Sequence, residues 1–163
     1  MVTVDNLLFA LTFTAALGCG LIAGLFFAFS VSVMRALARL PAAQGMAAMQ
    51  AINVVIINPI FLVVFLGTAA VCVFLIIAAL LGWQQTLGTV YLLTGSVLYL
   101  VGSLLVTMGF NVPMNESLAS VTPTDPDSAS LWAGYLTRWT AWNHIRTVAA
   151  LVAAASLTLA LCF

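Results

Sequence analysis

The sequence predicts an all-α fold, an integral membrane four-helix bundle with up-down-up-down topology. Two observations carry this prediction. Hydrophobic residues make up 64% of the 163 residues and charged residues only 5%, whereas a soluble domain carries about 25% charged residues. Four apolar runs are each long enough for a helix to cross a hydrocarbon core of about 30 Å, and none alternates as a strand would. Lipid therefore surrounds most of the chain.

The composition also excludes several classes of protein. Four Arg, no Lys and four acidic residues give no basic face, so we expect no nucleic-acid partner. High hydrophobicity excludes a disordered segment. Cys19, Cys72 and Cys162 lie inside apolar runs without a pairing pattern, which excludes a disulfide-stapled secreted domain.

The four apolar runs define the predicted spans. They cover about 7–34, 59–81, 87–110 and 143–163 of a single domain, residues 1–163. The first run begins after Asp5 without a basic region and is longer than a signal-peptide core, so we interpret it as a permanent span.

The connections between these spans differ in length. A short hairpin of about 82–86 joins the second and third, whereas long segments, 35–58 and 111–138, join the other pairs. Alternating spans place both long connections on one face of the membrane and both termini on the other. All four Arg lie on the long-connection side or at its boundary, so the positive-inside rule predicts a cytoplasmic membrane protein with both termini outside.

Two proline-containing strings predict irregular backbone at the long-connection end. Pro59 and Pro113 each remove a backbone donor and disfavour helix in the preceding residue, so the second and third helices are expected to be kinked or broken there. Asn58 and Asn115 could each cap a helix at these breaks. Alternatively, the freed backbone could line a site.

Small residues predict close helix packing. Gly88, Gly95, Gly102 and Gly109 recur every seven residues along the third span, which favours close contact with a neighbouring helix. A second ridge, from Ala16 through Gly20 and Gly24, recurs every fourth residue along the first span.

Polar and aromatic residues gather at the long-connection end. At about 100° per residue, a helix beginning near Asp127 or Ser128 places six side chains on one arc of about 100°, namely Trp132, Tyr135, Trp139, Trp142, Asn143 and Arg146. Such a face could form a slot for a flat, weakly polar ligand. An interfacial aromatic belt with a snorkelling Arg is the alternative.

His144 lies near 120° on the same wheel, away from this arc. It is the single His of the chain, and no Cys or second carboxylate accompanies it at metal-ligand spacing. We therefore expect neither a metal nor a haem site. His144 could carry a proton, or it could be an interfacial residue without a chemical role.

Two strings in their order along the chain carry a family resemblance. Asn111-Val112-Pro113-Met114-Asn115-Glu116, followed by Trp139-x-x-Trp142-Asn143-x-x-Arg146, resembles the small four-helix membrane family that includes the anthrone oxygenases of aromatic polyketide pathways. The resemblance covers nearly the whole chain. Glu116 departs from it, since Asp or Asn is commoner at that position.

The resemblance implies oxidation of an anthrone-like phenol to a quinone by O₂ without a cofactor. It implies that Trp139 and Trp142 stack the ring while Arg146 and Asn143 bind the oxyanion. Glu116 or His144 would take the proton. The remaining residues would position the substrate, namely Asn53, Asn58, Asn111, Asn115 and Tyr135.

Two other functions stay open. The same pocket could bind or transport a small aromatic or quinone-like molecule without catalysis. Alternatively, the protein could be a structural accessory in which Arg146 pairs with Glu116. The expected partners are membrane lipid and this small ligand, and the sequence does not set an oligomeric state.

Overall fold

The computed structural model describes residues 2–82 and 86–163. Within these ranges the chain is helical and contains no strand. The elements are α1 (Val2–Ala28), the π-helical η1 (Phe29–Val33), α2 (Met34–Leu37), α3 (Ala42–Val55), α4 (Pro59–Leu81), α5 (Leu87–Val97), the π-helical η2 (Leu98–Leu105) and η3 (Thr107–Asn111), α6 (Val112–Ala119) and α7 (Ser128–Ala160).

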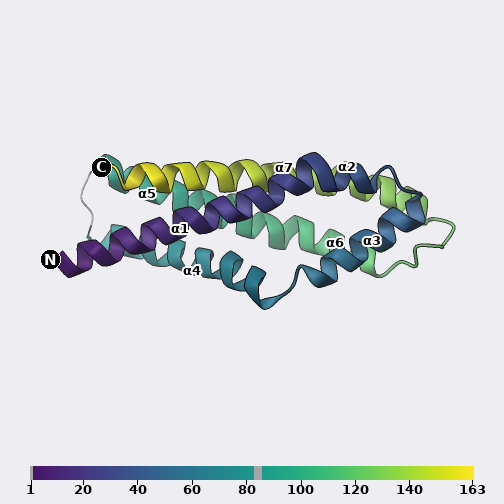
Figure 1. Ribbon diagram of the computed structural model, residues 1–163, viewed down its shortest axis with the longest axis horizontal. Helices are drawn as coiled ribbons and strands as arrows, with labels where there is room; N and C mark the ends of the chain where they lie inside the picture. The colour runs from purple at the N-terminus through teal and green to yellow at the C-terminus, as the bar shows by residue number, and fades with distance from the viewer. Residues whose placement is uncertain (1, 83–85) are drawn as a thin grey trace.

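Four helical units are long and apolar enough to cross a membrane. They are Asp5–Leu37, Pro59–Leu81, Leu87–Ala119 and Ser128–Ala160. Helix α7 packs against α1 and α5, and α4 packs against the same two helices. Both termini lie at one end, and α3 and the α6–α7 connection lie at the other (Figure 1). The predicted all-α membrane bundle and the alternation of its spans are therefore confirmed, although most of the predicted 82–86 hairpin lies outside the described residues.

The third helical unit extends further than predicted. Instead of ending at residue 110, it runs through Pro113 to Ala119. Pro113 follows π-helical turns, and the N–H of Val112 bonds to the carbonyl of Thr107, five residues back. Because the hydrogen bonding is already displaced by one residue there, the helix can continue past a residue that lacks an N–H.

The second helical unit begins where the sequence predicted. Asn58 has extended backbone, and its side chain accepts a hydrogen bond of 3.1 Å from the N–H of Phe61. Pro59 occupies the first turn of α4, where its missing donor costs nothing. Asn58 is thus the N-cap of α4, and residues 56–58 separate α4 from α3.

The exposed faces of the first helical unit and of α7 change character at one level. On α7, the exposed side chains are small or polar up to Ala141 and include large apolar residues from Ile145 onward. On the first helical unit, exposed Val31 is followed by exposed Arg35. A 33-residue helix is about 50 Å long, well beyond a hydrocarbon core of about 30 Å. The long-connection end therefore projects beyond the hydrocarbon region.

This division gives the protein two hydrophobic clusters. The membrane core joins α1, α4, α7 and the third unit around residues such as Cys19, Cys72 and Tyr99. The head core joins α2, α3, α6 and the first half of α7, and its buried members are Met34, Leu37, Met46, Met49, Leu118, Trp132, Tyr135 and Trp139.

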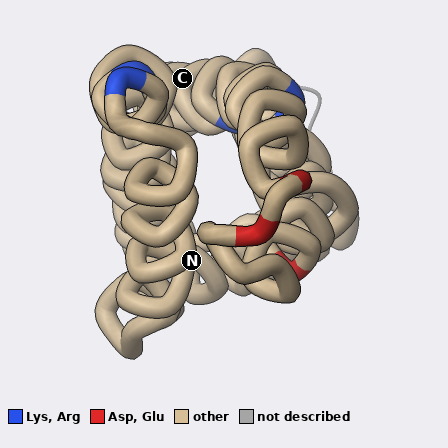
Figure 2. Tube along the Cα trace, turned by 90° about the vertical axis from the view of Figure 1, so that its right-hand side faces the viewer, with Lys and Arg blue, Asp and Glu red and all other residues tan. Residues whose placement is uncertain are grey.

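Basic and acidic positions occupy different sides of the bundle when it is viewed along its long axis (Figure 2).

The two predicted ridges of small residues behave differently. A Cβ at Gly95 would lie 2.9 Å from the carbonyl oxygen of Ala153, and one at Gly102 would lie 2.5 Å from the Cβ of Ala149. The third unit therefore packs on α7 through Gly95 and Gly102, as predicted, whereas a Cβ at Gly109 would meet nothing within 4 Å. Gly20 and Gly24 of α1 meet nothing within 4 Å, so the predicted packing ridge on α1 is wrong.

Candidate functional site

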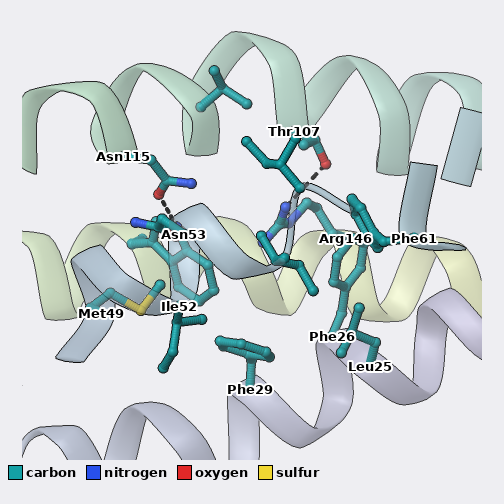
Figure 3. A pocket seen from close by; sticks show the side chains of 14 residues that line it. Leu25, Phe26, Phe29, Met49, Ile52, Asn53, Phe61, Thr107, Asn115 and Arg146 are labelled. Atoms are coloured by element: carbon teal, nitrogen blue, oxygen red, sulfur yellow. Dashed lines mark hydrogen bonds between the residues drawn. The ribbon is translucent and has the colours of Figure 1, made fainter. Parts of the chain in front are cut away.

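A cavity of about 120 Å³ lies at the junction of the membrane core and the head core. It is bounded by η1 and the end of α1, by α3 and the 56–58 segment, and by the third unit and α7 (Figure 3). Its lining is mostly apolar and comprises Leu25, Phe26, Phe29, Met49, Ile52, Asn53, Ile56, Ile57, Phe61, Thr107, Val112, Asn115, Trp139 and Arg146.

Arg146 supplies the positive charge of this cavity. Its side chain is only 4% exposed. Nη1 donates to the hydroxyl of Thr107 at 3.1 Å, and Nη2 donates to Oδ1 of Asn143 at 2.7 Å. The guanidinium carbon lies 4.1 Å from the ring centroid of Phe26 and 5.2 Å from that of Trp139, within the range of cation–π attraction. Neutral groups therefore hold the guanidinium in place.

Asn143 fixes Arg146 from behind. The amide is fully buried, and its Nδ2 donates to the carbonyl of Phe26 and to the hydroxyl of Ser30, both at 2.7 Å. Ser30 lies in the π-helical turn η1, and π-helical turns are frequent at functional sites. Asn143 thereby ties α7 to the end of α1 at the level of the cavity.

Asn115 lines the cavity from α6. Its Oδ1 accepts two hydrogen bonds, 2.9 Å from the hydroxyl of Tyr135 and 2.8 Å from Nε1 of Trp139. Asn115 lies inside α6 rather than at its start, so the alternative of a capping role is wrong. The residue instead satisfies the polar ends of two aromatic rings that are otherwise buried in the head core.

Two hydrogen-bond donors at the cavity lack partners. Among the described residues, Nε of Arg146 and Nδ2 of Asn53 are buried and make no hydrogen bond. Figure 3 shows Asn53 beside Asn115 and Arg146 beside Thr107, with the rings of Phe26, Phe29 and Phe61 around them. Buried donors are normally satisfied, so each of these two atoms has unused capacity for an acceptor oxygen.

Four predicted site residues line the cavity, namely Asn53, Asn115, Trp139 and Arg146. Three other predicted site residues, Asn143, Tyr135 and Asn111, lie behind the lining. Asn143 and Tyr135 make the hydrogen bonds described above. The third, Asn111, is buried and donates to the carbonyl of Trp139 at 3.3 Å.

The remaining predicted residues lie elsewhere. Trp142 is half-buried and stacks on Phe110 at a centroid distance of 3.6 Å, while Asn58 caps α4. Glu116 and His144 are exposed, and His144 lines a separate cavity together with Arg35. Among the described residues no ion pair joins Glu116 to Arg146, whose bonds go to Thr107 and Asn143.

The sequence interpretation missed several contributors to the cavity. The hydroxyl of Thr107 bonds Arg146, and the side chains of Phe26 and Phe61 supply aromatic walls. Thr107 lies four residues before Asn111. Helical spacing along the third span therefore places the two residues on the same face, and this spacing was the signal that could have identified Thr107. Within the part of the chain that the structure describes, no group of three His, Cys, Asp or Glu side chains could hold a metal ion.

Comparison with known families settles the relationship of the chain. The family model described as anthrone oxygenase matches residues 61–156. The chain belongs to the anthrone oxygenase family. The match runs from the first turns of α4 to near the end of α7 and includes Thr107, Asn115, Trp139 and Arg146. No curated protein and no solved structure matches the chain.

Proposed function

We propose that this anthrone oxygenase family member oxidises a phenolic ring with O₂ in the cavity around Arg146, without a cofactor. The observation that carries the proposal is the buried guanidinium of Arg146, whose Nε has no hydrogen-bond partner, together with the unpaired Nδ2 of the neutral Asn53 side chain. A buried charge at membrane depth is costly unless a partner compensates it. The oxyanion of a bound phenol supplies that compensation.

The chemistry needs little from the protein. When an anthrone, or a phenol that carries further electron-donating groups, loses its proton, the resulting anion is rich enough in electrons to reduce O₂ directly. A C–H carbon para to the oxygen becomes a second carbonyl, with one oxygen atom from O₂ entering the ring. The O–O bond breaks, the other oxygen leaves as water, and the four electrons that O₂ accepts come from the substrate. Preorganised donors that stabilise the anion lower the barrier.

Five of the lining residues have a physical part in this step. Arg146 and Asn53 donate to the oxyanion, whereas Phe26, Phe61 and Trp139 hold the ring between aromatic surfaces. No carboxylate or imidazole is among the residues that line the cavity. We therefore assign the substrate proton to water at the nearby membrane surface rather than to Glu116 or His144.

The test is O₂ consumption by the purified protein in lipid nanodiscs. We expect uptake of one O₂ per anthrone or phenol converted to quinone. Arg146→Ala should lower the rate by about 10²–10³, as expected for loss of an oxyanion donor. Arg138→Ala, which removes an exposed Arg from the same helix, is the matched control and should keep the rate. Absence of uptake across a panel of anthrones and phenols would overturn the proposal.

The cavity also favours a second function. Because its lining lacks a titratable base, the protein could bind or carry a phenolic or quinone-like molecule without converting it. Arg146-dependent binding without O₂ uptake would identify this non-catalytic function.

We further propose that the protein lies in a cytoplasmic membrane with its long connections facing the cytoplasm. All four Arg belong to that side or its boundary, as the positive-inside rule requires. Single cysteines placed at Ser130 and at Asp5 in a chain lacking the native cysteines test this orientation. An impermeant thiol reagent applied outside intact cells should label the cysteine at position 5 but not the one at position 130.

A further inference from the structure

We infer that the ligand of the cavity is a single-ring phenol with an alkyl chain that extends sideways into the bilayer. This inference rests on the proposed oxyanion site around Arg146, and it names the substrate class that fits there.

The size of the cavity sets the size of the ring. Its volume is about 120 Å³, whereas an apolar protein cavity of about 150 Å³ binds benzene. Sites for larger, drug-sized molecules span about 300–1,000 Å³. A fused three-ring anthrone would have to displace packed side chains such as Phe26, which is buried and stacked edge-on against Phe65. A single ring comes closest to this volume and needs the least displacement of the lining side chains.

The polar groups of the cavity fix the direction of that ring. The unpaired donors of Arg146 and Asn53 bind the phenolic oxygen, and Phe29 and Trp139 stand together beside them at a ring-centroid distance of 5.8 Å. A phenol held in this way directs its other side away from the guanidinium. Any substituent there must follow the path by which the cavity opens.

The opening faces lipid. The exposed lining residues are both aliphatic, Ile57 at 67% and Val112 at 39% exposure. The side chains next to the opening on the outer surface are also exposed and apolar, including Val54, Val55 and Ile60. Val112 lies next to the level at which the exposed face of α7 turns from polar to apolar, because the neighbouring Asn111 donates to the carbonyl of Trp139. An alkyl chain that leaves between Ile57 and Val112 therefore enters the acyl chains of the membrane.

The experiment compares ligands by binding rather than by turnover. The protein in nanodiscs is titrated anaerobically with meta-pentadecylphenol, with phenol and with anthrone, and empty nanodiscs correct for partition into lipid. We expect the alkylphenol to bind about tenfold more tightly than anthrone or better, because overpacking penalises the larger ring system. The long chain should also make it tighter than phenol.

Two variants test the lateral opening. Ile57→Trp and Val112→Trp put a large side chain at the mouth and should weaken alkylphenol binding by about tenfold. Ile60→Trp is the control, since Ile60 is 79% exposed nearby but does not line the cavity, and its binding should match that of the parent protein. All three positions are exposed, so thermal unfolding should confirm that each variant folds.

The outcomes separate this inference from the proposed function. Equal or tighter binding of anthrone, or unchanged binding in both mouth variants, overturns the inference even if O₂ uptake occurs. Arg146-dependent binding of the alkylphenol with both mouth variants impaired supports the inference even if no O₂ is consumed.

Discussion

Nη2 of Arg146 donates a 2.7 Å hydrogen bond to Oδ1 of Asn143, three residues earlier on α7. Residues three apart share one face of a helix, so the bond orients the guanidinium toward the cavity. Asn143 carries no charge and therefore fixes the position of the cation without neutralising it. The positive charge remains available to a ligand.

Removal of this amide should weaken both the fold and ligand binding. Asn143→Ala leaves the carbonyl of Phe26 and Nη2 of Arg146 without their buried partner, which costs about 1–3 kcal/mol of unfolding free energy. Thermal unfolding in one detergent, together with phenol binding, measures the effect. His144→Ala alters the exposed neighbouring residue and should have no effect. Equal unfolding temperatures for the two variants would contradict the role of Asn143.

Substitutions at Asn115 should separate stability from ligand affinity. Asn115→Leu removes the acceptor of Tyr135 and Trp139 and should cost about 1–3 kcal/mol. Asn115→Asp keeps an acceptor oxygen and should retain most of the stability. The added negative charge at the cavity should nevertheless weaken phenolate binding. If the Asp variant binds phenolate as tightly as the parent protein, the cavity does not bind an anion.

The glycine contact between the third unit and α7 should tolerate no added methyl group. Gly102→Ala places a Cβ against Ala149, and overpacking of this kind costs about 1–3 kcal/mol. Gly24→Ala adds the same methyl group at an open position on α1 and serves as the control. We expect a lower unfolding temperature for the first variant alone. The same decrease in both would show that helix packing is not the cause.

Tyr99 should contribute a buried hydrogen bond in the membrane core. Its hydroxyl donates to the carbonyl of Phe65 at 3.0 Å. Tyr99→Phe should lower the free energy of unfolding by about 0.5–1.5 kcal/mol, as measured by denaturant titration in mixed micelles. Tyr91→Phe alters a half-buried tyrosine earlier on the third unit and should lower the free energy of unfolding less. A larger effect at Tyr91 would argue against the bond.

Glu116→Gln and His144→Gln should each leave the rate of O₂ uptake within about twofold of the parent rate. Both side chains are exposed, and neither lines the cavity around Arg146, so neither reaches the bound ring as a general base must. The measurement is the same O₂ assay over a range of pH. A large decrease in either variant would restore that residue as the proton acceptor.

The sequence was most informative where residue types change along one helix. Helical periodicity in α7 predicted the buried face that carries Tyr135, Trp139, Asn143 and Arg146, because rare polar residues mark a face even in lipid. Trp142 lay at the edge of the same arc, and its half-buried position against Phe110 depends on where the third unit packs. Periodicity within one helix does not contain that information.

The apolar parts were harder to predict for a physical reason. A soluble helix shows a contrast between its buried and its water-facing residues, but a membrane helix meets apolar surroundings on both sides. Phe26 and Phe27 therefore look alike in sequence, although Phe26 lines the cavity and Phe27 is exposed. The same lack of contrast made the outward-facing small residues of α1 resemble a packing ridge. The end of the third unit was missed because π-helical turns have no sequence signature.

The common level at which the exposed faces of the first helical unit and of α7 turn from apolar to polar fixes how deeply the protein sits. A helix bundle with such a boundary experiences hydrophobic mismatch as a rigid body, since tilt or local deformation of the bilayer must accommodate all four helices together. In a bilayer of different thickness, Ile57 and Val112 would meet a different layer of the lipid, nearer the ester groups or nearer the midplane. Acyl-chain length in the host membrane thus becomes a variable that tunes access to Arg146 without any change in the protein.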